Sequence, residues 1–154
     1  MHELPRKLRV KRAREFSRKV VIDSAPECLE IGIDGEAIAG CFAVLEVTAI
    51  PLIGPRLPLA PSADPSDRSL EICLVGDNAA ERQAFARWLE DPESAEAVPV
   101  SLRRAQCLTI AGPFRRIRLD SKLWDSEPES RAAPPWPLIV GATEPEPLHF
   151  LVPG

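Results

Sequence analysis

Three aspartates stand where an enzyme could use them. Asp64 and Asp67 border the turn-forming stretch Asp64-Pro65-Ser66-Asp67, just before an apolar run, and Asp120 follows a second strand-like stretch. A carboxylate can accept a proton during catalysis, and hard oxygen ligands on a turn are what Mg²⁺ prefers. The sequence around these aspartates indicates which of these chemical roles each one could have.

The region before Asp67 alternates apolar runs with prolines. The runs 44–50 and 70–75 are rich in the branched residues that suit strands. The connection between them contains Pro51, Pro55, Pro58, Pro61 and Pro65. Such a connection cannot be helical and makes a poor central strand. Long, stiff connections inside a compact domain are uncommon and are often functional.

An ordered set of residues in this region carries a family resemblance: Gly54, Leu59, Ala60, Pro61, Ala63, Asp64, Asp67, Leu70, Leu74 and Val75. Their order and spacing resemble the C-terminal β domain of the diacylglycerol kinase-like lipid kinases, a family that includes sphingoid-base kinases. The resemblance covers about residues 25–154. Three positions depart from the family pattern. Ala49 replaces a strand-end Asn, Arg68 replaces a Gly, and Glu71 replaces a shorter Asp or Asn.

The resemblance implies a catalytic role for Asp120. In the family, an Asp at this position takes the proton from the lipid hydroxyl as that hydroxyl attacks the γ-phosphate of ATP. This sequence keeps Asp120 and Trp124 but has Lys122 where the family has Glu. The residues alone leave a structural alternative open, in which Asp120 ends a strand and pairs with Arg116 or Arg118.

The resemblance also implies a magnesium ion. The family position of Asp67 supplies a carboxylate ligand, and the backbone carbonyls of Asp64 and Ser69 complete the protein's share of the ligands. Arg68 would place a cation beside this site. A capped proline turn without metal is the alternative interpretation of the same residues.

The sequence contains no Gly-rich phosphate loop, because its eight glycines are scattered. The family binds ATP through a Gly-Gly-Asp-Gly-Thr loop in an N-terminal domain. We therefore expect the lipid-substrate domain of a lipid kinase, inactive alone and able to use ATP only with a separately encoded or deleted N-terminal domain. The lipid, the oligomeric state and the origin of the chain as fragment, split gene or degenerate copy are not predicted.

The N-terminus is strongly basic, although the whole chain has a net charge of −4. Residues 1–19 contain eight Lys or Arg and two Glu. Such an arm could hold an anionic membrane, and a non-catalytic module that binds membrane or a protein partner is the alternative function. The arm could equally be solvated or dock on its own acidic body. Its single aromatic residue, Phe16, argues against nucleic acid.

The four cysteines, Cys28, Cys41, Cys73 and Cys107, form no Cys-x-x-Cys pair. Three lie in apolar, strand-like contexts, which favours reduced, buried thiols over a disulfide or a zinc site. No apolar run is long enough to span a membrane, and no secretory signal is predicted. We expect a cytoplasmic protein, peripheral at the membrane if the basic arm binds lipid.

The patterns of the chain predict a mainly β fold. Alternating residues indicate strands near 29–33, 41–48, 106–110, 114–119, 138–140 and 148–152, with a hairpin turn at Asp34-Gly35. One short helix is expected at about 79–90, capped by Asn78 and Glu81. We expect an antiparallel, β-sandwich-like domain over 21–154 and a basic arm over 1–20. Residues 6–20 are expected to form a short basic helix, and a strand is expected to start over 19–23.

Overall fold

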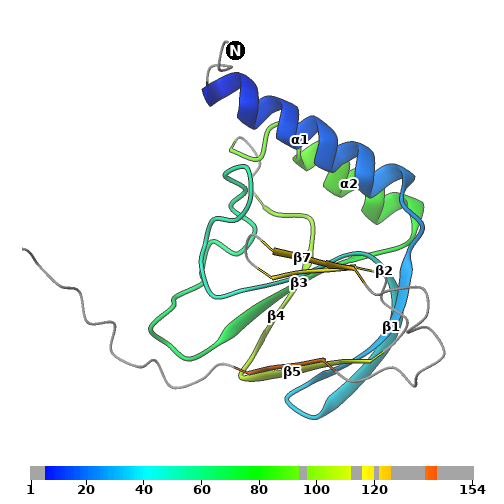
Figure 1. Cartoon of the computed structure of the whole chain (residues 1–154), viewed down its shortest axis with the longest axis vertical. Helices are drawn as coiled ribbons and strands as arrows, with labels where there is room; N and C mark the ends of the chain where they lie inside the picture. The colour runs from blue at the N-terminus through cyan, green and yellow to red at the C-terminus, as the bar shows by residue number, and fades with distance from the viewer. Residues whose placement is uncertain (1–5, 94–96, 112–115, 120–121, 126–137, 142–154) are drawn as a thin grey trace, which may run out of the picture.

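The computed structural model describes residues 6–93, 97–111, 116–119, 122–125 and 138–141. Its elements are α1 (Arg6–Asp23), β1 (Glu27–Ile33), β2 (Glu36–Thr48), β3 (Leu70–Gly76), α2 (Ala79–Trp88), β4 (Ser101–Ala105), β5 (Cys107–Ala111), β6 (Arg116–Leu119), β7 (Lys122–Asp125) and β8 (Leu138–Gly141). The two helices lie side by side at one end of the molecule, above the strands (Figure 1).

The strands form one six-stranded antiparallel sheet in the order β4-β3-β2-β1-β5-β8 and a separate two-stranded ribbon, β6-β7. The prediction of a mainly β, antiparallel domain is therefore confirmed. The described part of the predicted strand over 114–119 is β6, which pairs with β7. The strand expected at 148–152 lies outside the described residues.

The first hairpin joins β1 to β2 through the predicted turn. Asp34 and Gly35 both have positive φ, 48° and 90°, which is the geometry of the two-residue turns that match strand twist. The Asp34 carboxylate also accepts hydrogen bonds from the backbone N–H groups of Gln106 and Cys107, at 3.0 and 2.8 Å. This residue therefore works as a turn former that ties the hairpin to β5.

Strand β3 is buried over almost its whole length, and its alternating side chains serve two cores. Cys73 and Val75 pack with the helices, whereas Ile72 and Leu74 pack with residues of β1 and β5. Side chains of this size each contribute about 1.5–3 kcal/mol when fully buried. A strand with two buried faces explains why the run 70–75 is continuously apolar except at Glu71.

Helix α2 begins as its sequence predicts. The Asn78 side chain accepts a hydrogen bond from the backbone N–H of Glu81 at 2.9 Å. The Glu81 carboxylate accepts bonds from the Asn78 amide and from the backbone N–H of Gly76, both at 2.6 Å. Phe85 and Trp88 stack with ring centroids 5.3 Å apart and face the core, as the helical spacing predicts.

The proline-rich connection, residues 49–69, is a built part of the core. Its residues Leu57, Leu59, Ala60 and Ala63 are buried against β3 and α2. A bridge between Ile53 and Leu57 closes a tight loop in which Gly54 and Arg56 take positive φ. The connection is non-helical, as expected. Its prolines stiffen a segment that packs against the core and is not an open surface loop.

In addition to α2, the structure contains helix α1, whose amphipathic pattern is weak. It continues through Asp23, so the separate strand start indicated near 19–23 is wrong. Its apolar side chains are few, but Val21 is buried in the helix-side core. Arg18 pairs with Glu90 at 3.1 Å and Arg14 with Glu93 at 3.5 Å. Packing on α2 therefore supplies the stability that the weak amphipathic pattern does not.

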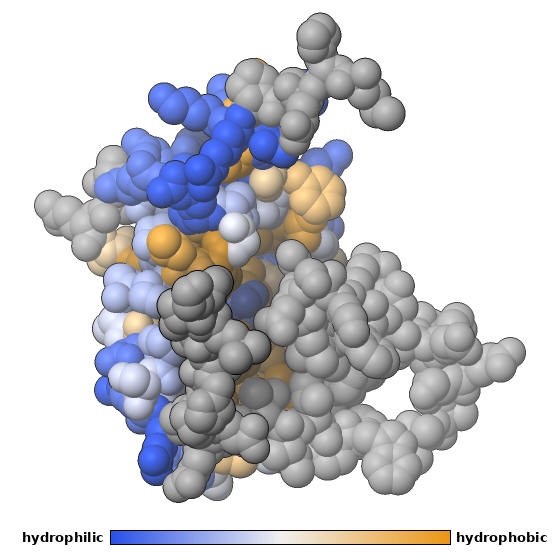
Figure 2. Space-filling view, turned by 60° about the vertical axis from the view of Figure 1, so that its left-hand side comes forward, coloured by the Kyte–Doolittle hydropathy of each residue, from blue (hydrophilic) through white to orange (hydrophobic). Residues whose placement is uncertain are grey.

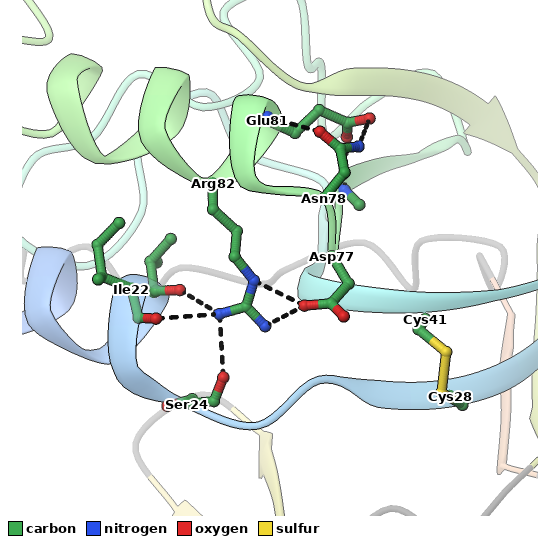
Figure 3. A network of polar contacts seen from close by, with 10 residues as sticks. Ile22, Ser24, Cys28, Cys41, Asp77, Asn78, Glu81 and Arg82 are labelled. Atoms are coloured by element: carbon green, nitrogen blue, oxygen red, sulfur yellow. Dashed lines mark hydrogen bonds and ion pairs between the residues drawn. A yellow bond between two sulfur atoms is a disulfide. The ribbon is translucent and has the colours of Figure 1, made fainter.

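The guanidinium of Arg82 joins these elements (Figure 3). It donates to the carbonyl oxygens of Val21 at 2.6 Å and Ser24 at 2.9 Å, where α1 ends. It also binds the Asp77 carboxylate at the end of β3, through Nε at 2.7 Å and through Nη2. The last carbonyls of a helix lack intrahelical partners and favour a cation. Because Arg82 is buried, this one side chain fixes α1 to α2 and the sheet.

The cysteines depart from the prediction of reduced thiols. Cys28 and Cys41 stand opposite each other in the β1–β2 register and form a disulfide. Sequence spacing hides this pairing, because only the strand register brings the two residues together. Cys73 is free and buried as expected, and burial raises the pKa of its thiol to about 12. Cys107 is free and exposed.

Replacing Arg82 should strongly destabilise the fold. Arg82→Ala removes a buried cation that serves several acceptors, so we expect a loss of about 2–4 kcal/mol in the free energy of unfolding. Urea denaturation measures this loss. Arg87→Ala, on the exposed side of the same helix, is the matched control and should change the free energy by less than about 0.5 kcal/mol. Equal effects of the two substitutions would contradict the role of Arg82.

Counting the reactive thiols by chemical labelling tests the cysteine arrangement. In the native protein without reductant, a thiol reagent at neutral pH should modify Cys107 alone, because Cys73 is buried and protonated and the other two cysteines are bonded. Denaturation should expose Cys73, and reduction should add Cys28 and Cys41. Labelling of Cys28 before reduction would show that the disulfide is absent.

Candidate functional site

The acidic turn before β3 is a tightly bonded loop. The Asp64 carboxylate accepts hydrogen bonds from the Ser66 backbone N–H at 2.8 Å and from the Ser66 hydroxyl at 2.6 Å. These bonds to the charged form hold the pKa of Asp64 below its ordinary value. The Asp64 carbonyl accepts the backbone N–H of Asp67 at 3.2 Å. Side-chain bonds of this kind are what Asp and Ser contribute to turns.

Asp67 has both of its carboxylate oxygens engaged. Its Oδ1 accepts the backbone N–H of Ser69 at 2.8 Å, and its Oδ2 pairs with Nη2 of Arg104 from β4. Between these residues, Arg68 takes a φ of 58°, a conformation that glycine adopts most easily. Arg68 therefore holds a backbone conformation that is strained for a residue with a side chain.

A second carboxylate shares the same arginine. Glu71 stands directly opposite Arg104 in the β3–β4 register, and its Oε1 lies 3.7 Å from the Arg104 Nε. The Glu71 side chain is 7% exposed, so it needs a partner. Sequence reasoning singled out Glu71 as a departure but missed Arg104. Only the pairing of strand 70–74 with strand 101–105 brings Arg104 opposite Glu71, and the sequence does not reveal this pairing.

In the structure, the Asp67 carboxylate of the predicted donor set is paired with a guanidinium and does not face an open position for a magnesium ion. Mg²⁺ needs oxygens that face a shared, open position. The Asp67 oxygens already bind an N–H group and a guanidinium, and the Asp64 carbonyl bonds within the turn. In the part of the chain that the structure describes, no group of three or more His, Cys, Asp or Glu could hold a metal.

Asp120 lies outside the described residues. The strands on either side are described, and Leu119 of β6 stands opposite Lys122 of β7. Asp120 thus falls in sequence between two paired strands, and its catalytic role stays a prediction.

A basic groove runs beside α1. Its volume is about 800 Å³, and it is bordered by α1, by residues 89–93 directly after α2, and by Arg56. Six basic residues line it: Arg6, Lys7, Lys11, Arg14, Arg18 and Arg56. Three glutamates, at 15, 90 and 93, offset part of this charge. Figure 2 shows the α1 end of the molecule as strongly hydrophilic, with a hydrophobic band beneath it.

The outer side of α1 has a different character. Leu8, Arg12, Phe16, Lys19 and Val20 follow one another at helical spacing and are all exposed. Phe16 is 69% exposed, which is unusual for a side chain of its size. No helix in the described residues is long and apolar enough to cross a membrane.

Comparison with known proteins gives a structural answer only. No family model and no curated protein matches the chain. Solved structures do match. Two, both described as diacylglycerol kinases of Bacillus anthracis str. Sterne, have TM-scores of 0.56 and 0.57 at 13% identity. A third, from the same organism and similarly described, has a TM-score of 0.53 at 12% identity.

The match extends over most of this chain but only part of its neighbours. The match to the first two structures covers 88% of this chain and 45% of the matched chain. The match to the third covers 86% of this chain and 44% of the matched chain. The chain thus spans less than half the length of the proteins that it matches. It shares the fold of one part of these diacylglycerol kinase-like proteins.

Proposed function

We propose that this chain is the lipid-substrate domain of a diacylglycerol or sphingoid lipid kinase-like protein. The observation that carries the proposal is the structural match, which spans nearly all of this chain and less than half of each kinase-like neighbour. The absence of a Gly-rich phosphate loop from the sequence agrees with this division. ATP and its magnesium ion would be bound by a separate domain of the kind that forms the N-terminal part of the family's proteins.

The chemistry assigned to this domain is proton acceptance and positioning. Phosphoryl transfer requires an oriented hydroxyl and a group that takes its proton, and little covalent chemistry by the protein. Asp120 is the proposed base, because the segment that carries it resembles the family's acidic motif and keeps Trp124. The proline-rich connection and Asp120 would border the cleft between the two domains, where ligand sites often lie.

Reconstitution in trans tests this function. The isolated chain should transfer no phosphate from ATP to diacylglycerol or a sphingoid base above an Asp120→Ala control. Adding a separately expressed, family-type ATP-binding domain should restore association and measurable turnover. Asp120→Asn should abolish that turnover and leave association intact, since it removes the base with little change in shape. Asp23→Asn, at the exposed end of α1, is the matched control and should keep full turnover.

Two results would remove the kinase proposal. One is a failure of the two domains to associate at tens of micromolar in a sedimentation experiment. The other is full activity of Asp120→Asn in the complex, because no proton acceptor would then be assigned to this chain.

A second function, binding to an anionic membrane, is favoured by the outer side of α1. An interfacial helix needs apolar residues that enter the headgroup region and cations around them. Phe16, Leu8 and Val20 are the exposed apolar residues, and Arg12 and Lys19 stand among them. The basic groove on the next side of the helix extends the positive surface. The chain would then be peripheral at the cytoplasmic face of a membrane.

Vesicle sedimentation tests the membrane proposal. The chain should bind vesicles that contain phosphatidylserine, should not bind purely zwitterionic vesicles, and should be released by salt. Arg12→Gln with Lys19→Gln should weaken binding by about 10- to 30-fold, given roughly 1 kcal/mol for each basic residue near the surface. Phe16→Ser should weaken it further by removing the apolar contact.

The control for this test changes the same charge elsewhere. Arg87→Gln with Arg103→Gln removes two exposed cations from α2 and β4. If this pair weakens vesicle binding as much as the α1 pair does, total charge and not the α1 surface controls binding, and the assignment to α1 is wrong.

A further inference from the structure

The Arg104 guanidinium lies at the centre of a small group of charges, and the inference from them rests on the same family resemblance as the proposed function. Two carboxylates meet this guanidinium from different segments: Asp67 from the acidic turn and Glu71 from β3. Arg104 itself belongs to β4, which is an edge strand of the main sheet. The arrangement thus joins a loop, a central strand and an edge strand through a single cation.

The burial of Glu71 makes this cation necessary. A carboxylate that is 7% exposed costs free energy unless a donor or a positive charge faces it. Arg104 faces it across the β3–β4 pair, directly in register. The planar guanidinium has donors on two sides, so it can meet Glu71 through Nε and Asp67 through Nη2 at the same time.

The length of Glu71 fits this arrangement. The family pattern has a shorter Asp or Asn at this position and a Gly in place of Arg68. In this chain the longer carboxylate reaches Arg104, and Arg68 adopts the positive φ of a glycine. The acidic turn therefore keeps its backbone form while its charges are balanced from within the protein.

We infer that the Arg104 guanidinium takes the place of the divalent cation that the family resemblance implies, and that this exposed side chain holds the acidic turn against the sheet without metal. The turn before β3 is then a metal-independent element. Removing the guanidinium would leave Asp67 and Glu71 facing a shared space, and two carboxylates with water are ligands that Mg²⁺ accepts.

Thermal unfolding with and without metal tests this inference. The melting temperature of the wild-type chain in millimolar MgCl₂ should equal that in EDTA with NaCl of matched ionic strength. Arg104→Ser should melt several degrees lower, because it leaves the buried Glu71 without its cation. Mg²⁺ should then raise the melting temperature of Arg104→Ser in a saturable way, as a ligand bound only to the native state does.

Two further variants make the result specific. Asp67→Asn in the Arg104→Ser background should remove the response to Mg²⁺, because it removes a metal ligand. Arg103→Ser, the exposed neighbour on β4, should melt close to the wild type and show no response to Mg²⁺. If Arg104→Ser does not fold, binding of Mn²⁺ to the wild-type chain, followed by electron paramagnetic resonance, decides the question. The expected result is no bound Mn²⁺.

Three outcomes would overturn the inference. The first is a saturable rise in the wild-type melting temperature with Mg²⁺ that Asp67→Asn abolishes, or tight Mn²⁺ binding by the wild type, since the metal would then hold the turn. The second is an Arg104→Ser variant that melts like the wild type. The third is a destabilised Arg104→Ser variant that Mg²⁺ leaves unchanged, because the guanidinium would then not occupy a cation position.

Discussion

The structure depends on one buried cation, the guanidinium of Arg82. Helix α1 ends with carbonyl groups that need donors, and its own last turn contains no basic residue. Arg82 supplies those donors from α2 and is neutralised by Asp77 at the end of β3. A buried charge that loses one partner is left in a poor environment, so the contacts on both sides of Arg82 form together. The position of α1 on the body follows from this constraint.

The helix layer in turn supports the surfaces to which a function is assigned. Phe85 and Trp88 of α2 share a core with Leu57 and Leu59 of the proline-rich connection. The basic groove lies along the joint between the helices and this connection, and the acidic turn follows the connection directly. The fold thus uses an arginine at each end of β3, a buried one (Arg82) and an exposed one (Arg104). Arg82 attaches the helices at one end of β3, and Arg104 attaches the acidic turn at the other.

The fold match and the sequence motifs agree that this chain resembles one part of a diacylglycerol kinase-like protein. Under the proposed function, this chain would supply the lipid side of a cleft, and the groups that position phosphate, which its sequence does not contain, would come from another domain. A basic helix with exposed apolar residues would suit a domain that works where lipid is found. The disulfide between Cys28 and Cys41 removes the reduced-thiol argument for a cytoplasmic protein, and the compartment stays a prediction.

Local patterns in the sequence determined the parts that depend on neighbouring residues: the Asp34-Gly35 hairpin, the Asn78 cap of α2, the face of α2 that carries Phe85 and Trp88, and the non-helical proline connection. The packing of helix α1 on the body, the Cys28–Cys41 bond and the Arg104 pairings were decided only by tertiary structure. Each depends on partners that are 13 to 61 residues away in sequence, as the separations of Cys28 from Cys41, Asp67 from Arg104 and Val21 from Arg82 show. Strand register and helix packing create those contacts, and no local pattern in the chain encodes them.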